Sequence, residues 1–279
     1  MIVDVHTHLS TLDQWGSAFT KAFAGAFKSR SIDLAVTPER HWQSMNHVDR
    51  AVVFGIESLA LGMHTPNESI AEYSNAHPDK IIGFMSIDPN SPDALEQLDY
   101  CVKTLGLRGI KMSPVYQDYH PSDEKARRVH RRAEQLGLPI LTHAAFHSIA
   151  STRMEWANPL LYDPVAREFP NLKIVLAHIG LPWFHDAMVM VRKHENVYAD
   201  VSPALHRGWM YQTLAMFQEF DVAEKLLLGS DFPISSSEQV IDCLQNINQI
   251  VEGTGLPKID PGIIEGIIHR DSLTLLGLN

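Results

Sequence analysis

Short runs of apolar, β-branched residues alternate along the chain with longer stretches of helical periodicity. The apolar runs cover residues 2–8, 51–56, 81–88, 107–113, 139–145, 173–179, 196–202 and 225–232. Near-continuous apolar strands that alternate with helices predict a parallel sheet covered by helices. Eight such strands favour a closed barrel over an open sheet, and no glycine-rich phosphate loop follows the first strand. We therefore predict an α/β protein with a (β/α)₈ TIM-barrel fold.

Capping signals set the expected helix boundaries. Ser91 and Ser122 each precede acidic residues in the way typical of a helix start. Gly106 and Gly137 follow helical stretches, where glycine suits the left-handed helix end. These signals predict helices that begin just after the serines and end at the glycines.

One connection is much longer than a usual βα link. The segment of about residues 10–50 follows the first strand, and Phe19, Phe23 and Phe27 recur in it at helical spacing. Long insertions in compact domains are usually lids or binding loops. We expect a single barrel domain over 1–279 with this insertion, which acts as a lid or packs as a helix over the barrel end.

Composition narrows the functional class. The 279 residues are 45% hydrophobic, and a formal net charge of −10 argues against nonspecific nucleic-acid binding or a basic membrane patch. With two cysteines the chain has neither a disulfide scaffold nor a cysteine zinc site. No signal peptide or transmembrane run is evident. We expect a cytoplasmic protein that acts on a small molecule.

The first strand brings two histidines together. Side chains alternate faces along a strand, so His6 and His8 should point the same way, with Val3 and Val5 on the other face. Neutral imidazole is a common ligand of divalent transition metals, so the pair is half of a metal site. Asp4 shares their parity, which makes it either a partner of the ligands or a buried residue bonded to the barrel backbone.

Polar residues also end the later strands. Lys111 ends the fourth, His143 the fifth, His178 the sixth and Asp231 the eighth. Active sites of such barrels lie at the carboxyl ends of the strands. We therefore expect these side chains to meet the two histidines of the first strand in one pocket.

These elements together resemble the amidohydrolase superfamily, in particular amidohydrolase family 2, over nearly the whole chain. The resemblance rests on five motifs, His6-Thr-His8, Gly109-Ile-Lys111, Leu141-Thr-His143, Ala177-His178-Ile-Gly180 and Gly229-Ser-Asp231-Phe-Pro233. It implies that His6, His8, His143 and Asp231 hold one divalent metal, zinc in first place and manganese in second. It also implies that His178 acts beside the reacting centre and that Asp231 doubles as a proton acceptor. A metal so held polarises a carbonyl and lowers the pKa of a bound water to about 7.

The remaining candidates concern substrate recognition. Lys111 is expected to contact a substrate carboxylate, although binuclear relatives carry a carboxylated lysine there and an ion pair with a nearby acid is a further alternative. Arg153 and Trp156, after the fifth strand, could clamp a planar anionic ligand. Further candidates of the same kind are His64, His147, His206, Arg207 and Trp209, and Asp200 and Ser202 share one face of the seventh strand.

The resemblance favours a metal-dependent hydrolase in which an activated water attacks an amide, lactone or ester of a small carboxylated or cyclic substrate. The alternative is a metal-dependent nonoxidative decarboxylase of an aromatic or unsaturated carboxylic acid. A noncatalytic binding protein on the same fold is the third hypothesis. For oligomeric state the resemblance suggests a homodimer.

Overall fold

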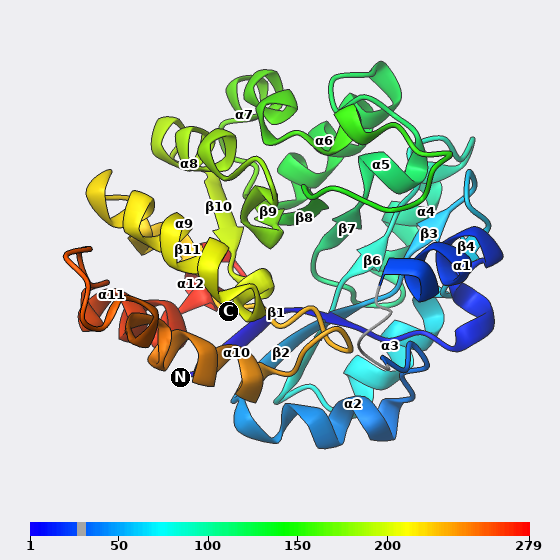
Figure 1. Ribbon diagram of the computed structural model, residues 1–279. Helices are drawn as coiled ribbons and strands as arrows, with labels where there is room; N and C mark the ends of the chain where they lie inside the picture. The colour runs from blue at the N-terminus through cyan, green and yellow to red at the C-terminus, as the bar shows by residue number, and fades with distance from the viewer. Residues whose placement is uncertain (27–31) are drawn as a thin grey trace.

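A computed structural model describes residues 1–26 and 32–279, and its strands form a closed ring with the helices outside it (Figure 1). The strands of the ring are β1 (Val3–His8), β2 (Arg50–Phe54), β5 (Ile81–Gly83), β6 (Met85–Ser86), β7 (Ile110–Met112), β8 (Ile140–His143), β9 (Ile174–Ala177), β10 (Val197–Asp200) and β11 (Leu226–Leu227). A small hairpin of β3 (Glu57–Ser58) and β4 (Met63–His64) lies outside the ring order. The predicted TIM barrel is confirmed.

Parallel pairing runs from β1 through β2 to β5, and from β6 through to β11. Only Phe84 separates β5 from β6, so the two form one interrupted strand. The ring closes where the Val5 amide donates to the Leu228 carbonyl at 2.9 Å and Thr7 pairs with Phe232. Each of the eight predicted apolar runs therefore contains one strand of the barrel, with β5 and β6 counted as one.

The helices lie mostly around the barrel, where they bury its outer face (Figure 1). They are α1 (Ser17–Ala26), α2 (Pro38–Ser44), α3 (Asn67–Ala76), α4 (Ala94–Lys103), α5 (Pro114–Gln117), α6 (Glu124–Leu136), α7 (Asp163–Glu168), α8 (Phe184–Lys193), α9 (Arg207–Glu219), α10 (Ser237–Gln245), α11 (Pro261–His269) and α12 (Ser272–Leu276). In the described part of the chain, no helix is both long and apolar enough to cross a membrane.

Helix starts differ slightly from the prediction. Asp93 and Asp123, rather than the serines before them, occupy the N-cap positions of α4 and α6. Gly137 ends α6 in the left-handed conformation, as predicted, whereas α4 already ends at Lys103 before Gly106. The predicted serine caps are wrong because an aspartate one or two residues later competes for the same position.

Two separate apolar layers hold the barrel. Alternate residues of the strands, among them Val3, Val5 and Leu141, fill the interior together with Leu273 and Leu276 of α12. The other strand residues pack outward against the helices. Apolar side chains of the strands and α12 thus fill one part of the barrel interior. Polar side chains occupy the part at the carboxyl ends of the strands.

A β-bulge in β1 corrects the predicted alternation. Asp4 pairs with Ala51 and Thr7 with Val53, so β1 carries one more residue than β2 between these pairs. The side chains of the adjacent residues Val5 and His6 therefore both lie in the barrel interior. The expectation that Val5 faces away from the histidines is wrong, because a bulge shifts the side-chain parity and re-aims the residues after it.

The insertion between β1 and β2 contains α1 and α2 in its described part. Trp15 and Phe19 are buried with Ile149 and Tyr116 in an apolar cluster of loops. Phe23 packs against the same cluster, while Phe27 lies outside the described residues. A helix packed over the loops is thus observed for α1, and lid motion stays a prediction.

Candidate metal centre

Three side chains converge at the carboxyl ends of β1 and β11. His6 Nε2 lies 3.2 Å and His8 Nε2 3.1 Å from Asp231 Oδ1. The three ligand atoms all lie within 4.8 Å of one another, and both histidines are buried. Two imidazole nitrogens and a carboxylate oxygen at this spacing form a donor set that fits a divalent cation.

The backbone holds Asp231 in an unusual conformation. Its φ is 56°, in the left-handed region that non-glycine residues seldom adopt. Its amide donates to the His6 carbonyl at 2.8 Å, and its carbonyl accepts from the Ile234 amide at 2.8 Å. These bonds fix the carboxylate beside the histidines, and such strained residues cluster at functional sites.

Asp200, at the end of β10, orients His6. Its Oδ2 accepts from His6 Nδ1 at 2.8 Å, so the lone pair of His6 Nε2 is directed at Asp231 and the ligand cluster. Gly229 makes this contact sterically feasible. A Cβ there would lie 3.0 Å from His6 Cβ and 3.1 Å from Asp200 Cβ.

A hydrogen-bonded chain runs from Asp200 to His143. Ser202 Oγ donates to Asp200 Oδ1 at 2.6 Å, so it accepts from His178 Nδ1 at 2.8 Å. His178 Nε2 then accepts from His143 Nδ1 at 3.2 Å. This chain assigns the tautomers, and it leaves a lone pair on His143 Nε2.

That nitrogen of His143 is buried and has no hydrogen-bond partner among the described residues. Buried polar atoms of native proteins are nearly always paired, so an orphaned one calls for a missing partner. A metal ion or a bound substrate would satisfy it. His143 stands next to the three-residue cluster rather than inside it.

Electrostatics favour the protonation states that metal ligands need at His8, His143 and Asp231, but not at His6. Burial and Lys111 lower the pKa of His6, but Asp200 and Asp231 outweigh them, so that this pKa is raised. Burial lowers the pKa of His8 and of His178 to about 4, and holds that of His143 well below its ordinary value. Burial alone would raise the pKa of Asp231, but the charges of His178 and His6 lower it well below the usual range. Neutral imidazoles beside an ionised carboxylate are the forms that bind a metal.

An aromatic wall adjoins the cluster. The rings of Phe54 and Trp15 lie 4.7 and 5.5 Å from the His8 ring, and Tyr116 lies 4.7 Å from His143. Phe19 stacks on Trp15 at 4.8 Å and meets Tyr116 edge-on at 6.0 Å. The metal candidates thus border a buried cluster of aromatic rings.

The chain matches a known sequence family over nearly its whole length. The sequence profile described as amidohydrolase matches residues 3–277. The chain belongs to the amidohydrolase family. Members of this family are metal-dependent hydrolases or decarboxylases, so the chain is that of an enzyme. The resemblance inferred from the five motifs is confirmed.

Among curated relatives, the γ-resorcylate decarboxylase of Rhodococcus jostii (strain RHA1) is 27% identical over 173 residues, which are 50% of each chain. The match thus spans about half the length of that relative. A probable 2-pyrone-4,6-dicarboxylic acid hydrolase of Acinetobacter baumannii shares 15% identity over 99% of both chains, with a TM-score of 0.68. A dihydroxybenzoic acid decarboxylase of Polaromonas sp. JS666, with bound manganese and the inhibitor 2-nitroresorcinol, shares 16% over 100% of this chain and 97% of its own, with a TM-score of 0.68. At these identities the two structures show a common fold.

Lys111 lies inside the cluster of this amidohydrolase rather than at its rim. Its Nζ lies 3.4 Å from His6 Nε2 and 4.7 Å from the centre of the Phe54 ring. Burial lowers the pKa of the ammonium to about 8, although Asp231 and Asp200 raise it. No carboxylate of the described ranges lies within ion-pair distance of Lys111, so its contact with a substrate carboxylate stays a prediction.

Arg153 and Trp156 have other partners in the structure. Arg153 Nε lies 3.5 Å from Asp118 Oδ1, and Trp156 Nε1 donates to the same oxygen at 3.1 Å. Trp156 also meets His120 edge-on at 5.2 Å. The structure brings neither into contact with the histidine cluster, and their role in substrate binding remains a prediction.

Asp4 is a structural residue. Its carboxylate accepts from Ser237 Oγ at 2.7 Å and from the amides of Ser230 and His6 at 3.0 and 3.1 Å. The second of the two expected roles, a buried residue bonded to the barrel backbone, is the one observed. The partner of His6 is Asp200, whose role the strand pattern alone did not identify.

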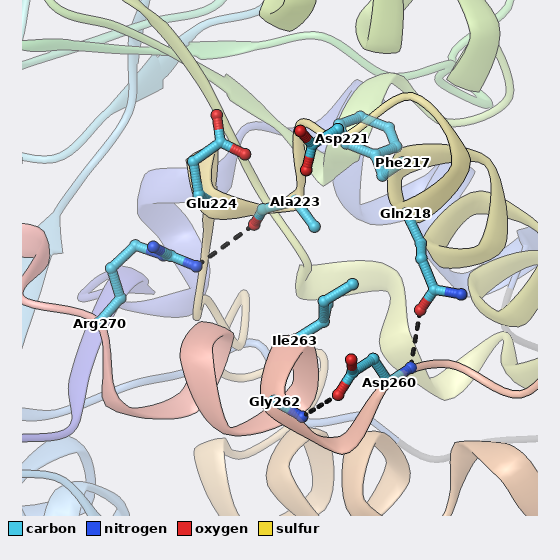
Figure 2. Close-up of a pocket in the computed structure, with 9 residues that line it drawn as sticks. All are labelled: Phe217, Gln218, Asp221, Ala223, Glu224, Asp260, Gly262, Ile263 and Arg270. Carbon is cyan, nitrogen blue, oxygen red and sulfur yellow. Dashed lines mark hydrogen bonds between the residues drawn. The ribbon is translucent and has the colours of Figure 1, made fainter.

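A separate hollow lies on the outside of the barrel, between the end of α9 and the start of α11 (Figure 2). It measures about 260 Å³, and Asp221, Glu224, Asp260 and Arg270 are among the residues that line it. Several of its polar groups are hydrogen-bonded. Arg270 donates to the Ala223 carbonyl at 3.3 Å, and Asp260 accepts from the Gly262 amide at 2.7 Å. It shares no residue with the candidate metal centre.

Proposed function

We propose that this amidohydrolase is a metal-dependent nonoxidative decarboxylase of an aromatic hydroxy acid. The observation that carries the proposal is the aromatic wall of Trp15, Phe19 and Tyr116 beside the ligand cluster. It suits a flat ring whose carboxylate reaches the cluster. The relationship to γ-resorcylate decarboxylase supports this choice over hydrolysis, which the motifs alone favour.

His6, His8 and Asp231 would hold one divalent ion, and His143 Nε2 would complete the set. Imidazole and carboxylate donors suit zinc and manganese alike, and zinc remains our first expectation. Such an ion would neutralise and orient the carboxylate and hydroxyl oxygens of the substrate.

Decarboxylation breaks the bond between the ring and its carboxyl carbon. The electron pair stays on the ring carbon, which then takes a proton as carbon dioxide leaves. Asp231, which is ionised in the free site, faces the open side of the cluster with a side chain that is 19% exposed, so it would first take a proton from water and then pass it to the ring carbon. His178 Nδ1 lies 3.9 Å from Asp231 Oδ2 and donates to Ser202 Oγ in the free site, so it would have to turn its proton from Ser202 to Asp231 to resupply it.

Hydrolysis is the second candidate. The same carboxylate of Asp231, close to the ligand atoms and partly open, could take a proton from an attacking water. The fold shared with the probable 2-pyrone-4,6-dicarboxylic acid hydrolase is compatible with this reaction.

Release of carbon dioxide and resorcinol from 2,6-dihydroxybenzoate by the metal-loaded protein tests the proposal. We expect turnover in the wild type and a loss of at least about 100-fold in Asp231→Asn, the usual scale of general acid catalysis. Hydrolysis of a lactone or ester panel without any release of carbon dioxide from hydroxybenzoates would instead establish the second candidate.

A further inference from the structure

His147 borders the aromatic wall on the side away from β1. It lies in the loop after β8, and its ring stacks on Phe19 with centroids 5.6 Å apart. The ring also meets Tyr116 at 4.6 Å, nearly at right angles, and its centroid lies 6.4 Å from that of His143. One face and one edge of the imidazole are therefore held by aromatic neighbours.

Its own loop fixes the tautomer of this ring. The Ile149 amide donates to His147 Nδ1 at 2.9 Å, so Nδ1 supplies a lone pair and the proton of the neutral ring sits on Nε2. Nε2 lies on the opposite edge of the imidazole from this contact. Among the residues that the structure describes, Nε2 has no hydrogen-bond partner. It is also not one of the fully buried unpaired atoms. It is an unpaired donor that is not fully buried.

We propose that His147 is a specificity-determining residue whose Nε2–H donates to an oxygen at the far end of the bound aromatic acid. The proposal rests on the proposed function, since it assumes that the reacting carboxylate occupies the metal cluster. The His143 and His147 rings meet edge-on with centroids 6.4 Å apart, so a benzene ring that lies across both of them would reach from the metal ligands to His147. An acceptor para to the reacting group would then face His147.

The surroundings of His147 make the bond selective. Phe19 and Tyr116 cover the ring, and burial lowers its pKa to about 4, so it stays a neutral donor at pH 7. A neutral hydrogen bond contributes about 0.5–1.5 kcal/mol net. The protein should therefore prefer a ligand that carries the distal oxygen by about 3- to 10-fold in Kd.

Isothermal titration of the metal-loaded protein with two unreactive probes tests the proposal. The probes are 2-nitroresorcinol and its analogue with one more hydroxyl para to the nitro group. Wild type should bind the second probe more tightly, and His147→Phe, which keeps a ring against Phe19 and Tyr116, should abolish the difference. His147→Gln, which restores an amide donor near Nε2, should recover part of it.

Thr152→Val is the matched control, because Thr152 Oγ1 bonds to the Ile149 carbonyl in the same loop at 2.9 Å. The Thr152→Val variant should still bind the second probe more tightly than the first. A preference that survives in His147→Phe overturns the inference, even if the wild type decarboxylates hydroxybenzoates. If His147→Phe loses the preference but the wild type releases no carbon dioxide from hydroxybenzoates, the proposed function is refuted and His147 remains a ligand contact. Failure of both probes to bind the wild type overturns both.

Discussion

At the scale of single residues, Asp200 links the two halves of the candidate centre. One carboxylate oxygen accepts from His6 Nδ1, and the other accepts from the amides of His178 and Ser202 and from Ser202 Oγ. Burial would raise the pKa of Asp200, but His6 lowers it below its usual range, so the group is ionised. One fixed charge thus sets the orientation of His6 and, through Ser202, the tautomers of His178 and His143.

Asp200→Asn should weaken metal binding by about 10- to 100-fold, the usual cost of losing a carboxylate that orients a ligating histidine. Competition with a chromogenic chelator measures this. Asp4→Asn is the control, because Asp4 is equally buried but bonds to Ser230 and Ser237. It should lower stability and leave metal affinity close to wild type. Equal losses of affinity in both variants would contradict the assigned role.

Gly229→Ala tests the close approach of β1, β10 and the loop after β11. The added methyl would lie about 3 Å from His6 and Asp200 carbons, tighter than ordinary contact, so the ligands must shift. We expect reduced metal affinity by the same assay. Gly208→Ala, with nothing within 4 Å of the new methyl, should leave affinity intact. Unchanged affinity in Gly229→Ala would show that the contact is easily relaxed.

At the scale of elements, the sequence pattern located every barrel strand because apolar β-branched runs have few other uses in an α/β chain. It could not locate the bulge in β1, since one extra residue leaves no mark in composition. Helix ends were predicted to within a few residues. Asp93 and Asp123 replaced the serines as caps because neighbouring polar residues compete for one position.

Helix α6 carries a buried histidine that should make stability depend on pH. Neither ring nitrogen of His130 has a hydrogen-bond partner among the described residues, and burial lowers its pKa to about 3. Between pH 6.5 and 3 the unfolded chain therefore binds more protons than the folded one, and stability falls as the pH drops.

Replacing His130 by Leu should flatten this slope. Relative to the variant, the wild type should lose about 2 kcal/mol of unfolding free energy between pH 8 and pH 5, by 1.36 kcal/mol per pKa unit. Denaturant titration in chelator at the two pH values measures it. His47→Gln, at an exposed position, should leave the slope as in wild type. Parallel curves for His130→Leu and wild type would refute the explanation.

At the scale of the whole molecule, barrel topology explains which site residues could be predicted. Strand ends of a closed parallel barrel meet at one rim, so His6, His8, His178 and Asp231 could be brought together from their positions alone. Loop residues have no such constraint. Arg153 and Trp156 contact Asp118, while Tyr116 and Trp15 reach the cluster from segments whose path the sequence does not specify.

The architecture also explains why the insertion matters. A (β/α)₈ scaffold supports many chemistries by loop variation, and the fold alone does not select one. Here α1 and the turn before it contribute Trp15 and Phe19 to the wall beside the ligands. In our proposal, the preference for decarboxylation over hydrolysis rests on this segment outside the barrel core.

Metal content per chain, measured by elemental mass spectrometry after reloading and desalting, tests the central claim most directly. We expect about one zinc or manganese ion per wild-type chain, and well under half of that in His6→Ala and in Asp231→Asn. A full complement of metal in both variants, or none in the wild type after reloading, would contradict the assignment of His6, His8 and Asp231 as the metal centre.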